Sequence, residues 1–285
     1  MTDGLERYVR EWEGNAAADP LWVILTDPKR YGRAWDPREF YATGEEEVRR
    51  VFAFMAGAAL PRPSGRFLDF GCGVGRISRA LLPSFESGVG VDISARMVEL
   101  ASTNVPGVEF VVNQGPTLAA VPDASVDFVW SHIVLQHIPN RHQRGYLNEL
   151  LRVLRPGGLA AFQLPVEIVN RQVERPPAWY RFKQAVKRAL PVLVAIKRRL
   201  RPVAGFHYEF RYEMHALPDH EVREICDRGG GVIEAAPATN SCEPEHNGRV
   251  EFFDRDARRR ELVESGLPNR YLSLMYFVRK TGAVP

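Results

Sequence analysis

The sequence predicts an α/β fold in which a doubly wound, mostly parallel sheet is flanked by helices. Short apolar runs typical of buried strands alternate along the chain with amphipathic helical segments. One of these runs, at 67–70, leads through a glycine-rich turn directly into a helix, as in α/β proteins that bind nucleotide-like ligands. Seven strands are expected, at 67–70, 88–93, 108–112, 126–131, 159–164, 232–236 and 270–279.

Length and composition describe an ordinary globular chain. Its 285 residues suit one large domain or one domain with appendages, and 45% are hydrophobic and 26% charged. A net charge of +3 is too small to imply a partner. The three cysteines form no CxxC pair, which disfavours disulfides and structural zinc. No apolar run approaches the roughly 18 residues of a membrane-spanning helix, and residues 1–15 lack the apolar core of a signal peptide. A cytoplasmic protein is expected.

The segment FLDFGCGVGRISRAL holds the first strand, the glycine turn and the start of a helix. Gly71, Gly73 and Gly75 stand at alternate positions, where the backbone turns sharply and a ligand can approach closely. A dinucleotide site would have its third glycine three positions after the second, but Arg76 stands there. The second strand ends in Asp92, 17 positions beyond Gly75. An acid at that place can accept hydrogen bonds from both hydroxyls of a ribose.

The pattern Asp69-x-Gly-x-Gly-x-Gly followed by Asp92 resembles motifs I and II of the class I S-adenosylmethionine-dependent methyltransferases. VDFVWS at 126–131 and LRVLRPGG before the fifth strand resemble later segments of the same family. The resemblance covers roughly residues 66–165 and 215–280. It implies a Rossmann-like, seven-stranded sheet with an antiparallel last strand, and S-adenosyl-L-methionine as the cofactor.

Three regions are expected along the chain. Residues 1–60 would form an N-terminal helical cap, 61–165 with 212–285 the methyltransferase domain, and 166–211 a basic helical insertion after the fifth strand. Within the cap, a helix is expected to begin at Thr43. The cap is either a layer packed on the sheet or, through Trp22, Tyr41 and Thr43, a lid over the cofactor. Between the last two strands, 239–268 is expected to be a long charged loop.

The resemblance also implies which residues contact the cofactor. The turn backbone at Gly71 and Gly73 would face the methionine moiety, Asp69 its ammonium group, and Asp92 the ribose. Gln114 is carried over as an adenine contact, because the acid common after the third strand is missing. The full expected set is Tyr41, Asp69, Gly71, Cys72, Gly73, Gly75, Arg76, Asp92, Ile93, Met97, Gln114 and Ser131.

A hydroxyl acceptor would also need a base. His137, just past the carboxyl end of the fourth strand, is the first candidate, because histidine titrates near neutral pH. The alternative is a histidine that only packs. Glu167, just beyond the fifth strand, is the second candidate, and His132 and His215 are weaker ones.

No metal is expected. Family members that hold a metal at this edge use two acids and a histidine, whereas this chain has Ile133 and Gln136 beside His137.

The acceptor itself is only loosely indicated. Residues 175–201 carry nine basic side chains and no acid, interleaved with apolar ones. This pattern predicts either a solvated charged face or a cover for a small or lipid-linked, anionic acceptor with possible contact to a membrane surface. O-methylation of a sugar or another small or lipid-linked metabolite is the preferred function. An RNA methyltransferase that uses the basic insertion, and a binding protein without turnover, are the alternatives. A nucleic-acid acceptor is disfavoured, because Ser131-His-Ile-Val lacks the amide and the aromatic residue of base-methylating enzymes.

Overall fold

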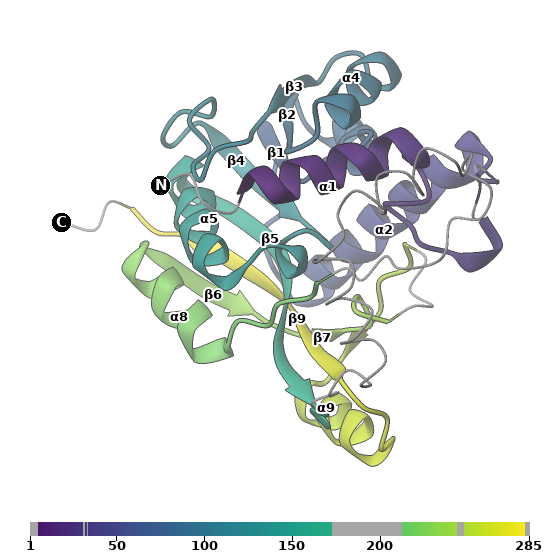
Figure 1. Ribbon diagram of the computed structural model, residues 1–285. Helices are drawn as coiled ribbons and strands as arrows, with labels where there is room; N and C mark the ends of the chain where they lie inside the picture. Colours follow the sequence, from purple (N-terminus) through teal and green to yellow (C-terminus); the bar gives the residue numbers. More distant parts are fainter. Residues whose placement is uncertain (1–4, 31, 33, 173–212, 244–247, 283–285) are drawn as a thin grey trace.

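The computed structural model describes residues 5–30, 32, 34–172, 213–243 and 248–282. Its centre is one mixed sheet in the strand order β3-β2-β1-β4-β5-β9-β7-β8, with β6 also paired to β9 (Figure 1). The strands from β3 to β5 are parallel neighbours, and β9 lies antiparallel to β5. The strands are β1 Arg66–Phe70, β2 Ser87–Asp92, β3 Glu109–Val112, β4 Val126–Ser131, β5 Leu154–Val169, β6 Gly231–Ala235, β7 Ala238–Thr239, β8 Phe252–Phe253 and β9 Arg270–Lys280.

Helices cover both faces of the sheet, as expected for a doubly wound fold. Two of them, α5 and α8, pack into a large apolar cluster with β1, β4, β5 and β9. The helices α2 and α3 belong to a second cluster that contains Phe67, Phe128 and Phe277. The helices are α1 Leu5–Ala18, α2 Pro37–Gly57, α3 Arg76–Leu81, α4 Ala95–Asn104, α5 Asn140–Val153, α8 Asp219–Arg228 and α9 Arg255–Glu264, with short 3-10 turns η1 Pro28–Arg30, η2 Leu82–Ser84 and η3 Leu135–His137.

The N-terminal part of the chain lies across the carboxyl ends of the parallel strands. Figure 1 shows α1 in front of that edge, with α2 running behind it. The Glu13 carboxylate of α1 accepts a hydrogen bond from the Ala95 amide at the start of α4 (2.5 Å). Near the other end of α1, Arg7 and Tyr8 both donate to the Glu213 carboxylate (3.1 and 3.3 Å). The first helix is thus tied down on two sides of the sheet edge that carries the ligand site in this fold.

The expected start of α2 was wrong. The helix begins at Pro37, one turn and a half before Thr43, because Asp36 caps it by accepting hydrogen bonds from the Arg38 and Glu39 amides (2.9 and 3.1 Å). Proline at the first helical position lacks the amide proton that would go unused there. The Asp36-Pro37 pair therefore starts the helix.

The expected loop at 239–268 was also wrong in part. It contains β8 and α9, and Asp254 caps α9 by accepting from the Ala257 amide (2.8 Å). Its sequence, RDARRRELVE, buries only Arg258 and Leu262, so no apolar stripe announces the helix.

In the part of the chain that the structure describes, the sheet has nine strands, against the seven expected. The expected sixth strand continues as two pieces, β6 and β7, that both pair with β9 on either side of Pro237. The fifth strand is longer than expected because its antiparallel pairing with β9 continues to Val169. The expected insertion at 166–211 therefore overlaps the end of β5, and its basic stretch lies outside the described residues. Within the described ranges, no helix is long and apolar enough to cross a membrane.

Candidate active site

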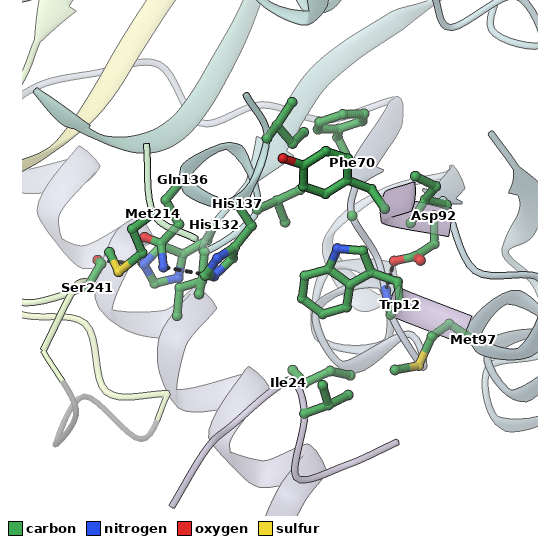
Figure 2. Close-up of a pocket in the computed structure, with 18 of the residues that line it drawn as sticks. Trp12, Ile24, Phe70, Asp92, Met97, His132, Gln136, His137, Met214 and Ser241 are labelled. Atoms are coloured by element: carbon green, nitrogen blue, oxygen red, sulfur yellow. Dashed lines mark hydrogen bonds between the residues drawn. The ribbon is translucent and has the colours of Figure 1, made fainter. Parts of the chain in front are cut away.

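A cavity of about 430 Å³ lies at the carboxyl ends of β1, β2 and β4. Its walls come from α1, the turn at 22–26, the glycine turn, the segment 132–139 and residues 241–243 (Figure 2). In the view of Figure 2, the Trp12 indole of α1 lies between His137 on one side and Asp92 and Met97 on the other. The rings of Trp12 and His137 meet edge to face, with centroids 5.8 Å apart. The cavity therefore has two ends, an Asp92 end and a His132–His137 end.

Glycine is required at two positions of the turn that forms the Asp92 end. Gly71 has φ +80°, and a Cβ there would come within 2.3 Å of the Val134 side chain. Gly73 has φ +52°, and a Cβ there would lie 2.6 Å from Ile24 Cδ1. Both positions combine the left-handed backbone that glycine favours with a lack of space. The backbone of the turn is consequently exposed to the cavity without side chains in front of it.

The Asp92 carboxylate is fixed by backbone amides. Its Oδ2 accepts from the Gly73 amide and its Oδ1 from the Ser94 amide, each at 2.9 Å. Ser94 in turn caps α4 by accepting from the Met97 amide (3.2 Å). Burial raises the pKa of Asp92, and these amides oppose that rise because they favour the charged form. The arrangement presents a carboxylate of fixed direction beside the glycine turn.

Asp69 lies behind the turn. It is 2% exposed, and the Ser78 hydroxyl donates to its Oδ2 at 2.6 Å. Burial raises the pKa of Asp69 to about 7. Tyr41 also supports the turn from outside, because its hydroxyl donates to the Val74 carbonyl (3.0 Å).

The structure brings some of the expected cofactor residues together and places others elsewhere. Gly71, Gly73, Arg76, Asp92, Ile93 and Met97 line the cavity, as does the expected base His137. Residues that do not line it are Tyr41, Asp69, Cys72, Gly75, Gln114, Ser131 and Glu167. Asn113 lines the wall where Gln114 was expected, and the Gln114 side chain instead donates to the Ile93 carbonyl (3.3 Å).

The two expected bases have different surroundings. His137 accepts at Nε2 from the Gln136 amide (3.1 Å), and its Nδ1 lies 3.4 Å from the Glu213 carbonyl. Burial lowers the pKa of His137 to about 4, so the imidazole is neutral and weakly basic at neutral pH. Glu167 forms a double ion pair with Arg259 (2.8 and 2.7 Å), which holds the pKa of its carboxyl below the usual value.

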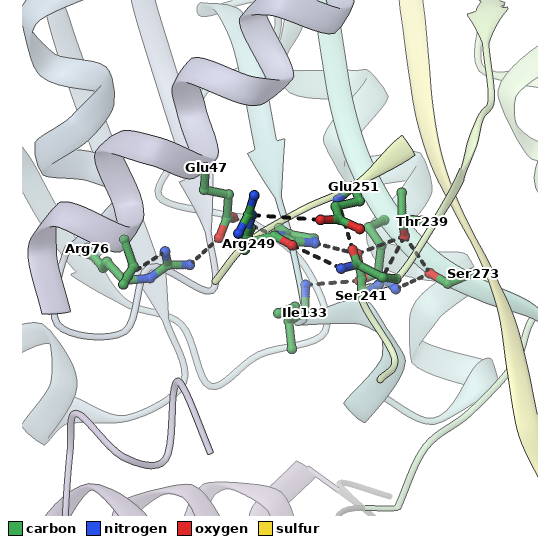
Figure 3. A network of polar contacts seen from close by, with 12 residues as sticks. Glu47, Arg76, Ile133, Thr239, Ser241, Arg249, Glu251 and Ser273 are labelled. Carbon is green, nitrogen blue, oxygen red and sulfur yellow. Dashed lines mark hydrogen bonds and ion pairs between the residues drawn. The ribbon is translucent and has the colours of Figure 1, made fainter. Parts of the chain in front are cut away.

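A buried polar cluster that the sequence analysis did not find adjoins the His132–His137 end of the cavity. Figure 3 shows Glu47, Arg76 and Ser241 of this cluster. Glu47 of α2 binds the Arg76 guanidinium (2.8 Å) and His132 Nδ1 (2.5 Å). His132 Nε2 lies 2.7 Å from the Ser241 hydroxyl. The side chains of Glu47 and His132 have no exposed surface, and Ser241 is 4% exposed. One signal was available: Glu47 lies on the helical face of Val48 and Val51, where a charge is out of place.

Among the described residues, no group of three or more histidines, cysteines and acids could hold a metal ion.

In sequence, the chain is similar to known methyltransferases. Residues 68–162 match the family described as a methyltransferase domain. The trans-aconitate 2-methyltransferase of Azoarcus sp. is 29% identical over 70% of this chain and 77% of that protein. The trans-aconitate 2-methyltransferase of Methylobacterium nodulans is 31% identical over 46% of this chain. The matched part covers only 50% of that protein. A solved S-adenosylmethionine-dependent methyltransferase from Mesorhizobium loti superposes with a TM-score of 0.49 at 19% identity, over 80% of this chain and 97% of that one.

Proposed function

We propose that this chain, which belongs to the class I S-adenosylmethionine-dependent methyltransferases, methylates a hydroxyl oxygen of a small molecule bound beside the cofactor in the cavity. The observation that carries the proposal is the division of one cavity into two chemically different ends. The Asp92 end offers a carboxylate and bare backbone, and the other end offers His132, His137 and Ser241.

The residues at the Asp92 end fit S-adenosyl-L-methionine. The Asp92 carboxylate, held by two amides, suits the two hydroxyls of a ribose. Ile93, Met97 and Phe70 give apolar walls for an adenine ring, and the backbone of Gly71 and Gly73 allows close approach. When bound, the cofactor supplies a methyl group already activated by a sulfonium. The chain then has to align the acceptor, exclude water and accept a proton.

The opposite end suits an acceptor of low charge. Tyr8, Trp12 and Trp22 are among the residues that line the cavity, and aromatic rings of this kind can pack against a sugar or an aromatic ring. Arg76 is the only arginine or lysine among the described residues that line the cavity, and Glu47 already neutralises it. A tricarboxylate such as trans-aconitate would therefore lack a dedicated cation among these residues. A sugar or another small hydroxylated metabolite matches the wall better.

Anionic or lipid-linked acceptors and contact with a membrane surface depend on the basic stretch at 175–201, which lies outside the described residues. They remain part of the proposal from sequence alone, as does the RNA alternative.

The experiment has two stages. Calorimetry first measures S-adenosyl-L-methionine binding, and methyl-labelled cofactor is then offered with a panel of sugars, phenols and trans-aconitate. We expect transfer to a hydroxyl acceptor. Transfer to trans-aconitate alone would contradict the proposed hydroxyl chemistry, and binding without any transfer would favour a protein that holds the cofactor without turnover.

A further inference from the structure

We infer that Ser241, His132 and Glu47 form a proton relay that deprotonates the acceptor hydroxyl, with Ser241 as the group that touches it. The inference rests on the proposed function, since a relay has a task only if the acceptor atom carries a proton. Three segments far apart in the chain meet here: α2, the segment after β4, and the segment after β7. All three side chains are buried, and His132 and Ser241 line the cavity.

The ring of His132 is oriented from one side. Its Nδ1 lies 2.5 Å from Glu47 Oε1, and because a carboxylate oxygen can only accept, the ring donates from Nδ1–H. The other carboxylate oxygen of Glu47 accepts from Arg76, which fixes the acid in turn (2.8 Å). A carboxylate at Nδ1 selects the tautomer in which Nε2 is the ring atom that accepts a hydrogen bond, and the Ser241 hydroxyl lies at that atom. Glu47 is thus a positioning residue for the ring of His132.

The hydroxyl of Ser241 completes the path to the cavity. It lies 2.7 Å from His132 Nε2 and 2.8 Å from the Thr239 hydroxyl. Thr239 has a single hydroxyl proton. The Ser241 hydroxyl is the better acceptor for this proton, because the Ser273 hydroxyl lies 3.3 Å from the Thr239 hydroxyl, beyond the usual length of an O–H···O bond. Ser241 then accepts from Thr239, donates to His132, and keeps one lone pair for an incoming acceptor hydroxyl.

The proton balance of the step is complete. The acceptor O–H bond breaks, its proton passes to Ser241 Oγ, and the proton of Ser241 passes to His132 Nε2. The acceptor oxygen keeps the electron pair of its former O–H bond. It would use this pair to bond the methyl carbon that the bound cofactor would supply, and the electron pair of the methyl–sulfur bond would stay on sulfur. The positive charge lost by the sulfonium appears on His132 beside Glu47, and it leaves later as a proton to solvent.

His137 is less suited to this task. The Gln136 amide already occupies its Nε2, and burial lowers its pKa to about 4. The structure therefore favours His132, a weaker candidate from sequence, over His137 as the proton acceptor.

The first test needs no acceptor. In the protein with ¹⁵N-labelled histidine, we expect one imidazole proton far downfield at neutral pH, with the Nε2 of the same ring unprotonated. The signal should disappear in His132→Gln and move upfield in Glu47→Gln. A ring protonated on both nitrogens would overturn the relay, because it could accept nothing.

The second test uses acceptor acidity. The panel includes phenol and 4-nitrophenol, which is largely ionised near neutral pH and needs no base. General bases contribute roughly 100- to 10,000-fold to rate. Ser241→Ala and His132→Gln should therefore lose that much turnover with the least acidic hydroxyl that wild type methylates, and much less with 4-nitrophenol. Ser273→Ala, which removes a buried hydroxyl outside the cavity wall, is the matched control and should keep its rate.

The outcomes separate the two proposals. If Ser241→Ala and His132→Gln both methylate the least acidic hydroxyl at the wild-type rate, the relay is overturned and the proposed function stands. If the variants lose the same fraction of turnover with the least acidic hydroxyl and with 4-nitrophenol, the side chains have a structural role and the relay is also overturned. A wild type that binds S-adenosyl-L-methionine but methylates no hydroxyl of the panel overturns the proposed function, and the relay with it. Cofactor affinity and melting temperature confirm that each variant is folded.

Discussion

The two ends of the cavity are built in different ways. At the Asp92 end, residues 71–94 supply the glycine turn, the carboxylate and the amides that hold it. At the other end, side chains from α2, from the segment after β4 and from the segment after β7 meet in a buried cluster. A site made of local backbone tolerates change in distant segments. A site made of distant, buried side chains depends on each of them, because removing one leaves its partner buried without a hydrogen bond.

Glu47 provides the largest test of that dependence. Replacing it by alanine leaves the buried Arg76 guanidinium without its counter-ion and His132 without its acceptor. Breaking a buried ion pair from one side costs about 3–5 kcal/mol. Glu47→Ala should therefore lower the free energy of unfolding by about that amount in a denaturant titration.

Glu46, the neighbouring residue on α2, is the matched control. It pairs with Arg49 and Arg50 at the surface, where ion pairs contribute less than about 1 kcal/mol. If Glu46→Ala and Glu47→Ala had the same small effect, the buried cluster would not hold the acceptor end together.

His137 gives the acceptor end a pH dependence. Its pKa is about 4 in the folded protein, against about 6.5 for an unperturbed histidine in the unfolded chain. The unfolded state binds the proton more tightly, so the neutral ring contributes stability above about pH 6.5 that is lost as pH falls toward 4. The loss is at most about 3 kcal/mol.

The measurement compares unfolding free energies of wild type and His137→Gln across that pH range. Subtracting the two curves cancels the other titrating groups. We expect the stability of wild type to fall relative to the variant as the pH is lowered, and two parallel curves would contradict the account.

Trp12 lies between the two ends and should affect both modestly. Its indole packs edge to face on His137 and lines the cavity. Such aromatic contacts contribute about 0.5–1.5 kcal/mol beyond buried area. Trp12→Ala should therefore weaken cofactor binding and raise the acceptor KM by up to about tenfold each, and Trp12→Phe should restore most of both. An effect on one of them alone would show that α1 covers only that end.

The parts that the sequence predicted well are those encoded locally. The strand β4 has the expected bounds, Val126–Ser131, and the first strand and the glycine turn were also expected. They follow from apolar runs and glycine spacing within a few residues. The family and its cofactor followed from the same short stretch.

The parts that the sequence did not predict need contacts between distant segments. Glu47, His132 and Ser241 carry no signal of their meeting, because 85 residues separate the first pair and 109 the second. The helix α9 was missed because its charged sequence has no apolar stripe. The placement of Asp69 behind the turn follows from its bond to Ser78 of α3, which spacing alone could not reveal.

One measurement tests the division of the cavity most directly: calorimetry of S-adenosyl-L-methionine on Asp92→Ala and Ser241→Ala, beside wild type. Hydrogen bonds from the ribose hydroxyls to the Asp92 carboxylate are charge-assisted, and bonds of this kind contribute about 1.5–3 kcal/mol each. Asp92→Ala should therefore weaken cofactor binding by roughly 100-fold. Ser241→Ala should bind as wild type does while losing turnover. Equal binding by wild type and Asp92→Ala, or a comparable loss of affinity in Ser241→Ala, would contradict the account.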